Sequence, residues 1–195
     1  LIFSSLSGLD RAKDNYKTLL TDNIKPYFHN FKESKIGKPT EQFIFNNSIF
    51  SASSLNYLTG LLFLKNNIKK LDNKVYLEIG GGFGTVGEIL IKLKIKNIKY
   101  INLDLPPLNI ISKFYLQNAC RRNVTDHFDF QKKDVIKISE LKTLSCFPNF
   151  DIEKFKGKIS VFINFISLQE MEYDVVKNYI DKIFILCPKY ILLRN

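Results

Sequence analysis

Short apolar stretches alternate along the chain with segments whose apolar residues recur at helical spacing. Five of these stretches are predicted to be strands, at residues 75–79, 100–104, 128–131, 159–164 and 190–193. Helices are predicted from Gly84 to about Lys94, from Pro107 to about Arg121 and over 173–184. Strands that alternate with helices indicate βαβ units and a parallel sheet covered on both faces. The predicted fold class is therefore α/β, a doubly wound parallel sheet.

The first third of the chain follows a different pattern. Residues 1–72 are predicted to form a helical N-terminal segment or lid, and residues 73–195 the cofactor-binding domain. Apolar residues after Gly8 are spaced for an amphipathic helix, and Pro26 interrupts a second one. Further along we expect a turn at 37–39, an extended piece at 43–45 and a helix from Ser51 or Ser53 to about Leu71.

The other end of the chain closely follows a predicted strand. Asn195 lies two residues beyond the strand at 190–193, and the stretch 139–157 is predicted to be a loop with one short helical turn. We therefore expect a sheet truncated after its fifth strand, in a fragment that lacks both ends of a longer protein.

A glycine-dense turn joins the strand at 75–79 to the next predicted helix. Gly80, Gly82 and Gly84 let the backbone turn tightly and approach a ligand, and the helix that follows points unpaired N–H groups at it. Glu78 adds a carboxylate inside the apolar strand, so the turn reads Glu-x-Gly-x-Gly-x-Gly. This pattern is typical of a nucleotide-cofactor site, and it resembles the first motif of class I S-adenosylmethionine (SAM) methyltransferases.

The same residues also satisfy a dinucleotide fingerprint, because residues 82–87 read Gly-x-Gly-x-x-Gly after a strand and into a helix. A dinucleotide pyrophosphate sits over such a turn and would be repelled by the carboxylate of Glu78. SAM has no phosphate and carries a cationic amine and a sulfonium. Glu78 therefore favours SAM, and a NAD-type oxidoreductase remains the alternative.

Polar residues follow other predicted strands, at the edge where open parallel sheets bind ligands. Asp104 ends the strand at 100–104, where a carboxylate can accept both hydroxyls of a ribose. Asp134 follows the strand at 128–131, where it can accept a hydrogen bond from an adenine amino group. Either Asp can also be an ordinary turn residue. The predicted cofactor-binding residues are Glu78, Gly80, Gly82, Gly84, Asp104 and Asp134.

A polar segment follows the strand at 159–164, where the transferable methyl group should point. Methylating a hydroxyl requires removal of its proton as the oxygen attacks the sulfonium carbon. Glu170 is the predicted base if burial raises its pKa, and Asn164 is predicted to help orient the hydroxyl. Glu170 is also typical of a first helical turn, where the dipole favours an acid, and His29 is an alternative base.

Composition limits the partners that we expect. With 195 residues, 45% hydrophobic and 25% charged, the chain has the profile of a single globular domain. Its net charge of +10 would suit nucleic acid. The basic residues are mostly Lys scattered among Asn and Ile, with short clusters only at 121–122 and 132–133. Because a nucleic-acid footprint should be clustered, we expect no nucleic-acid partner.

The cysteines, the histidines and the apolar runs indicate where in the cell the protein is expected. The 3 cysteines show no Cys-x-x-Cys spacing and the 2 histidines have no partner at ligand spacing, so we expect neither disulfide nor metal. Cysteines without a disulfide pattern are typical of a reducing compartment, so we expect the protein to be cytoplasmic. The first residues do not form a signal peptide, and the apolar run at 58–64 is too short to cross a bilayer, so no membrane span is expected.

Three segments, in order, resemble the bacterial sugar O-methyltransferases of surface-polysaccharide loci. They are 77–84, 103–106 with Tyr115-Leu116, and 167–171, supported upstream by 53–58, and the resemblance covers about residues 36–195. It implies a Rossmann-like class I methyltransferase fold and a sugar or glycan acceptor. It also implies that SAM is bound by Glu78, Gly80, Gly82 and Asp104, with Asn164 and Glu170 near the methyl-transfer centre.

Other function classes stay open from the sequence alone. An RNA or small-molecule methyltransferase uses the same cofactor motif. A NAD-type oxidoreductase satisfies the glycine pattern, and a cofactor-binding module without its own activity would satisfy both. The acceptor sugar, the hydroxyl methylated and the oligomeric state are not indicated by any residue pattern.

Overall fold

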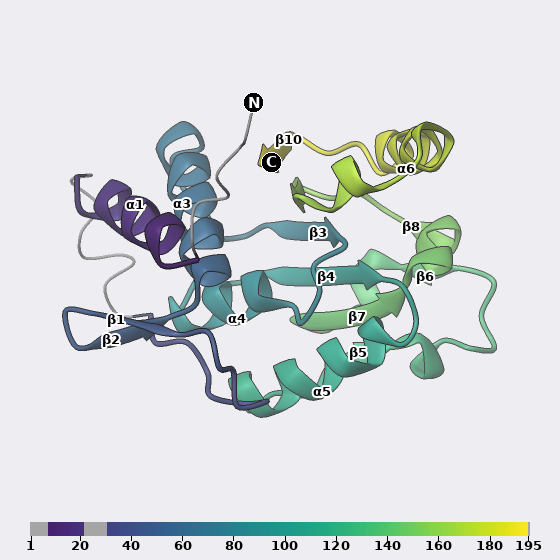
Figure 1. Cartoon of the computed structure of the whole chain (residues 1–195). Coiled ribbons are helices and arrows are strands. Elements are labelled where there is room, and N and C mark those ends of the chain that lie inside the picture. Colours follow the sequence, from purple (N-terminus) through teal and green to yellow (C-terminus); the bar gives the residue numbers. More distant parts are fainter. Residues whose placement is uncertain (1–7, 22–30, 195) are drawn as a thin grey trace.

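The computed structural model describes residues 8–21 and 31–194. Within these residues, a 6-stranded sheet in the order β10-β9-β3-β4-β7-β5 forms the centre of the molecule (Figure 1). All neighbouring strands of this sheet are parallel. The predicted Rossmann-like doubly wound parallel sheet is therefore confirmed.

Most elements of the sheet layer lie close to their predicted positions. Strand β3 leads into helix α4, strand β4 into α5, and strand β9 through α6 into β10. Their bounds are β3 Val75–Ile79, α4 Thr85–Lys92, β4 Lys99–Asp104, α5 Leu108–Cys120, β9 Val161–Phe165, α6 Tyr173–Ile185 and β10 Tyr190–Arg194. The apolar periodicity thus identifies four of the strands and the three helices between them.

The prediction of a strand at 128–131 is wrong. A short strand, β5 (Val124–Asp126), comes before it, and His127–Asp129 form a 3-10 turn, η1. The Asp126 carboxylate accepts a hydrogen bond from Phe128 N (3.1 Å), and Asp129 accepts one from Asp126 N (3.0 Å). This reciprocal capping box favours a turn in spite of the alternating pattern.

The prediction of a loop at 139–157 is wrong in its middle. Residues Leu144–Pro148 form strand β7, which lies between β4 and β5. All five residues of β7 are buried, so no alternation of apolar and polar positions marks it. Short elements surround it: η2 (Ile138–Glu140), η3 (Asn149–Lys154) and a parallel pair of strands, β6 (Ile136–Lys137) and β8 (Phe155–Lys156).

The N-terminal segment consists of two helices and a hairpin in the described residues. Helix α1 (Gly8–Thr21) and α3 (Ala52–Asn67) flank an antiparallel pair, β1 (Phe43–Phe45) and β2 (Ser48–Phe50). Ser51 caps α3 by accepting a hydrogen bond from Ser54 N (3.0 Å), as predicted. The predicted second helix with Pro26, and His29, lie outside the described residues.

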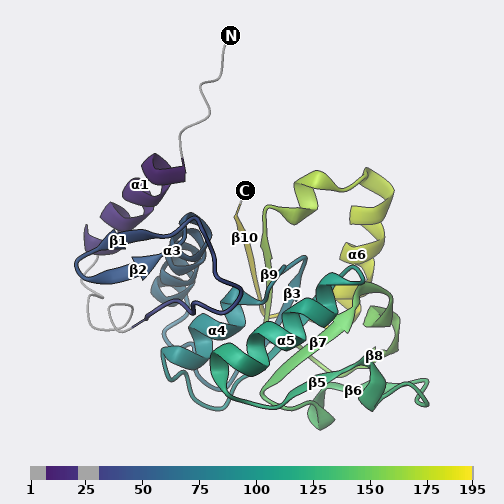
Figure 2. The ribbon, with the colours of Figure 1, turned by 60° about the horizontal axis from the view of Figure 1, so that its bottom comes forward.

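Helices cover both faces of the sheet. Helices α3, α4 and α5 lie over one face, and α6 lies over the other (Figures 1 and 2). Among residues 8–21 and 31–194, no helix combines enough length with enough apolar character to cross a bilayer.

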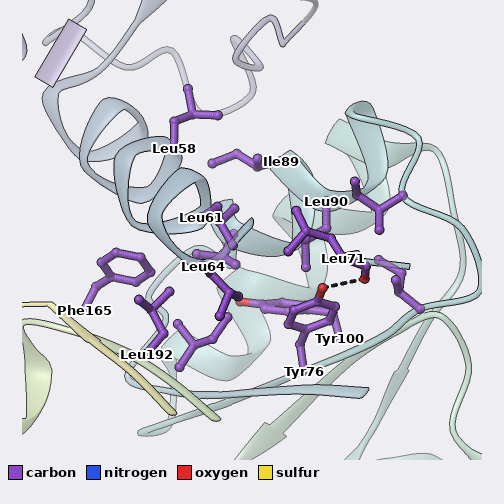
Figure 3. Close-up of a cluster of buried hydrophobic side chains, with 14 of the residues drawn as sticks. Leu58, Leu61, Leu64, Leu71, Tyr76, Ile89, Leu90, Tyr100, Phe165 and Leu192 are labelled. Carbon is purple, nitrogen blue, oxygen red and sulfur yellow. Dashed lines mark hydrogen bonds between the residues drawn. The ribbon is translucent and has the colours of Figure 1, made fainter. Parts of the chain in front are cut away.

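The core on the α3 side joins the N-terminal segment to the sheet. Leu58, Leu61 and Leu64 of α3 lie against side chains from α4 and the strands (Figure 3). Tyr76, on β3, is fully buried there, and its hydroxyl donates to Leu71 O (2.6 Å). Because the apolar side chains of both parts share one core, the N-terminal segment is held to the sheet by hydrophobic burial.

We expect the Leu61→Ala substitution to lower the free energy of unfolding by about 2–5 kcal/mol. Leu61 is 0% exposed in this shared core, so the shorter side chain leaves a cavity. The matched control is Phe63→Ala on the same helix, whose side chain is 64% exposed. Urea denaturation of both variants measures the difference. Equal losses would contradict the placement of α3 on the sheet.

Candidate functional site

The candidate site lies where the strand order of the sheet reverses. The chain passes from β3 to β4 and on towards one edge, and later returns to β9 on the other side of β3. Ligands of open parallel sheets bind outside the carboxyl ends of the strands at such a point. The glycine turn, residues 80–84, follows β3 here, and the 3-10 turn η4 (Ser167–Glu170) follows β9.

All three predicted glycines adopt positive φ angles, 69° at Gly80, 55° at Gly82 and 82° at Gly84. A Cβ atom on Gly80 would lie 2.2 Å from Ser167 Oγ, and one on Gly84 would lie 2.8 Å from the Leu116 side chain. A Cβ atom on Gly82 would meet nothing within 4 Å. The turn is therefore packed tightly at both ends, and its middle residue is the place where a ligand can approach the backbone.

Asn102, on β4, fixes the shape of the glycine turn. Its side-chain oxygen accepts a hydrogen bond from Gly81 N (3.2 Å), and its amide group donates to Gly82 O (3.2 Å) and Ser112 Oγ (2.8 Å). Asn102 is buried beside Glu78 in the register of the two strands. Sequence reasoning did not identify this residue, because its role depends on partners 20 positions away.

Glu78 is buried directly beneath the turn. Its carboxyl group is 1% exposed and accepts a hydrogen bond from the hydroxyl of Tyr100. Burial raises the pKa of Glu78 to about 8, the nearby charge of Asp104 adds to the rise, and the Tyr100 hydrogen bond opposes it. The free protein therefore holds an acid that is mainly protonated at neutral pH, at a place where a bound cation would favour its ionised form.

Asp104 closes β4 beside the turn, as predicted. One carboxylate oxygen accepts a hydrogen bond from Gly82 N (2.7 Å) and the other from Leu105 N (2.7 Å). Burial raises the pKa of Asp104, and these two backbone hydrogen bonds oppose the rise. Since each carboxylate oxygen has two lone pairs, Asp104 can hold the turn and still accept hydroxyl donors.

Asn164 lies at the end of β9, but its polar atoms serve the protein itself. Its amide nitrogen donates to Ile79 O (2.8 Å) and Ser167 Oγ (2.6 Å), and its oxygen accepts from Leu168 N (3.2 Å). These bonds give Asn164 a positioning role within the protein, and its role in orienting an acceptor hydroxyl stays a prediction. Asn164 ties the segment after β9 to the end of β3.

This segment contains a strained residue. Ile166 has φ 69° and ψ −47°, a combination that a β-branched residue rarely adopts. Its backbone N donates to Arg194 O (3.0 Å) on β10, and its carbonyl accepts from Gln169 N (3.0 Å). Strain of this kind persists only where surrounding bonds fix it, and it is concentrated at functional sites.

The structure changes the setting of two predicted residues. Glu170 ends η4 and is exposed, so the burial that its predicted role as the base assumed is not present. Asp134 is exposed on a turn before β6, and its adenine role was based on a strand at 128–131 that does not form. The residue that follows the sheet strand next to β4 is Asn149, at the start of η3.

His127 has a structural partner. Its Nδ1 atom lies 2.6 Å from a carboxylate oxygen of the fully buried Asp151, and Lys154 Nζ lies 3.0 Å from the other.

Within residues 8–21 and 31–194, no group of three or more His, Cys, Asp or Glu side chains is arranged to hold a metal ion.

A second buried acid supports the helix after the turn. Glu88 of α4 is 0% exposed and accepts hydrogen bonds from Tyr115 Oη (2.6 Å), Lys92 Nζ (2.5 Å) and Ser34 N (2.9 Å). These bonds join α4 to α5 and to the N-terminal segment. The only sign of this residue in the sequence is an acid within an apolar helical face.

Comparison with known proteins gives only distant likenesses. No family model matches the chain. No curated protein matches it either. Structures with a similar arrangement include mycolic acid cyclopropane synthase CmaA1 complexed with SAH and CTAB, at 11% identity and TM-score 0.48, over 94% of this chain and 53% of that one.

Two further structures are comparable. Coclaurine N-methyltransferase bound to N-methylheliamine and SAH has 11% identity and TM-score 0.46, over 95% of this chain and 50% of that one. Thermoplasma acidophilum 1320 has 12% identity and TM-score 0.42, over 68% and 55%. This chain thus spans about half the length of these proteins, and likenesses this distant carry no conclusion about its cofactor or substrate.

Proposed function

We propose that this chain is a SAM-dependent O-methyltransferase that methylates a sugar hydroxyl in the synthesis of a surface polysaccharide. The observation that carries the proposal is Glu78, an acid buried beneath an open glycine turn at the point where strand order reverses. A buried acid with a raised pKa is suited to a cationic ligand, because the cation compensates for the cost of its ionisation. The resemblance at 77–84, 103–106 and 167–171 supports the sugar acceptor.

The residues around the turn fit SAM. The open backbone at Gly82 leaves room for the ligand, and Asp104 can accept the ribose hydroxyls. Glu78 lies so close beneath the turn that a Cβ on Gly81 would be 2.8 Å from its carboxyl oxygen. When ionised, Glu78 would therefore attract the cationic amine and sulfonium of SAM bound over the turn.

The same geometry disfavours NAD. A pyrophosphate over the turn would lie near the carboxyl group of Glu78, and the Gly82 N–H that could donate to it already donates to Asp104. Ionising Glu78 would then cost free energy instead of contributing to binding.

We assign the proton transfer to Glu170. When bound, SAM supplies an electrophilic methyl group on its sulfonium. Glu170 would accept the proton of the acceptor hydroxyl as the hydroxyl oxygen bonds to the methyl carbon, while the methyl–sulfur bond breaks and its electron pair stays on the sulfur. Asn164 acts through η4, because its hydrogen bonds to Ile79, Ser167 and Leu168 fix where the turn that carries Glu170 begins.

The alternatives differ in what they require. An RNA methyltransferase needs a clustered basic surface, whereas the +10 charge is carried mainly by scattered Lys. A module without activity would bind SAM and transfer no methyl group. Methyl transfer to a glycan by the intact protein distinguishes the sugar proposal from both.

We expect SAM to bind and NAD not to bind, and Glu78→Gln to weaken SAM at least about tenfold at pH 8.5. A charge interaction over a short distance near a protein surface is worth on the order of 2 kcal/mol. Because the pKa of Glu78 is about 8 in the free protein and falls when a cation binds, SAM affinity should rise as the pH rises towards about 8 and then level off. Isothermal titration calorimetry across this range measures both effects.

The control for this experiment is Glu140→Gln, which changes an exposed acid on η2. It should leave the affinity and its pH dependence unchanged. Tight NAD binding, or a Glu78→Gln variant that keeps the wild-type affinity at pH 8.5, would contradict the role of Glu78.

We expect Glu170→Gln to slow methyl transfer by roughly 10²–10⁴-fold and to leave SAM affinity unchanged, because only proton removal is lost. Single-turnover measurements with labelled SAM and a glycan acceptor test this. Gln169→Ala, a change at the neighbouring exposed residue, is the control. Wild-type turnover in Glu170→Gln would assign the base to another residue.

A further inference from the structure

We propose that a cleft between α1, α3 and β10 binds the acceptor as an uncharged sugar ring, and that Tyr57 forms part of its wall. The cleft has a volume of about 420 Å³, and its lining includes Arg11, Asp14, Asn56, Tyr57, Ile166 and Arg194. This volume lies in the range of small-molecule sites, about 300–1,000 Å³. The inference rests on the proposed function only for the methyl-transfer step.

The cleft reaches the candidate site through Ile166. This strained residue lines the cleft and lies directly after β9, beside the turn that carries Glu170. Its backbone is fixed by hydrogen bonds to Arg194 and Gln169. Ile166 therefore lies between the cleft and the segment that we assign to proton transfer.

Tyr57 connects the cleft with strand β9. Its ring contacts the ring of Phe165 on β9 edge-on, with centroids 4.8 Å apart. Burial raises the pKa of Tyr57, and the negative charges of Glu78 and Glu33 raise it further. The same side chain lines the cleft, so the contact with Phe165 joins the cleft wall to the end of β9.

The polar groups of the cleft are already arranged. Arg194 donates from Nε to Asn56 Oδ1 (2.5 Å) and from Nη2 to Asn15 Oδ1 (3.0 Å). These bonds fix a planar guanidinium and two amides from three different elements. Rigid planar groups of this kind can donate to and accept from neighbouring hydroxyls without losing much side-chain freedom on binding.

The charge of the cleft indicates what it binds. Arg11 and Arg194 are balanced by Asp14 and Glu41, so the lining has no excess positive charge. A nucleic-acid backbone would need such an excess. A sugar ring carries only hydroxyls and an apolar C–H face, which match the polar lining and the ring of Tyr57.

The test is saturation-transfer NMR with a panel of methyl hexopyranosides and methyl 6-deoxyhexopyranosides, with and without SAM. We expect at least one glycoside to bind, and Asn56→Ala and Asp14→Ala each to weaken it at least about fivefold. SAM affinity should change less than about twofold in both variants. Asp14 is exposed on α1, so this variant should fold even if the loss of the Asn56–Arg194 bond harms folding of the other. The matched control is Asn67→Ala at the far end of α3.

The outcomes separate the two proposals. If SAM binds the wild type and no glycoside does, or if glycoside binding survives both variants, the cleft is not the acceptor site. Displacement of a bound glycoside by a short single-stranded RNA would overturn the inference in the same way. If SAM fails to bind while a glycoside binds and both variants weaken it, the cleft stands and the methyltransferase proposal falls.

Discussion

The burial of one carboxyl group, that of Glu78, is the constraint on which the surrounding structure depends. Water is excluded from it, so protein groups must replace the solvent. Tyr100 donates the compensating hydrogen bond, and its ring needs Gly87, where a Cβ would lie 2.5 Å from the ring. Asn102 then fills the space beside it and holds the turn above. Gly87, in the first turn of α4, is thus required by a side chain that solvates the acid.

On the β9 side of the site, side chains hydrogen-bond to backbone groups. Asn164 ties the segment after β9 to Ile79 at the end of β3, and Gly80 leaves room for Ser167. The strain at Ile166 is held between these bonds and β10. The two strands at the reversal of strand order are therefore joined by side-chain bonds as well as by the sheet.

Features with a local cause could be predicted from the sequence, and features with a distant cause could not. Two features with a local cause are the positive φ angles of Gly80, Gly82 and Gly84 and the helix cap made by Ser51, because each depends only on residues within a few positions. The role of Asn102 depends on β4 lying beside β3. Strand β7 was missed because burial on both faces removes alternation, and the 128–131 strand was predicted because alternation was present where Asp126 and Asp129 cap a turn. The exposure of Glu170 likewise depends on how η4 leaves the sheet.

The segment around Glu33 and Ser34 is hydrogen-bonded to two helices, α3 and α4, that both follow it in the sequence. Glu33 accepts hydrogen bonds from Ser51 Oγ and Ser54 Oγ at the start of α3, and Ser34 N donates to Glu88, 54 positions later. On the ribosome this segment is made first, yet its second anchor emerges only once α4 has been translated. The contact of this segment with α4 can therefore form only after residue 88 has been made, although its contact with α3 can form earlier.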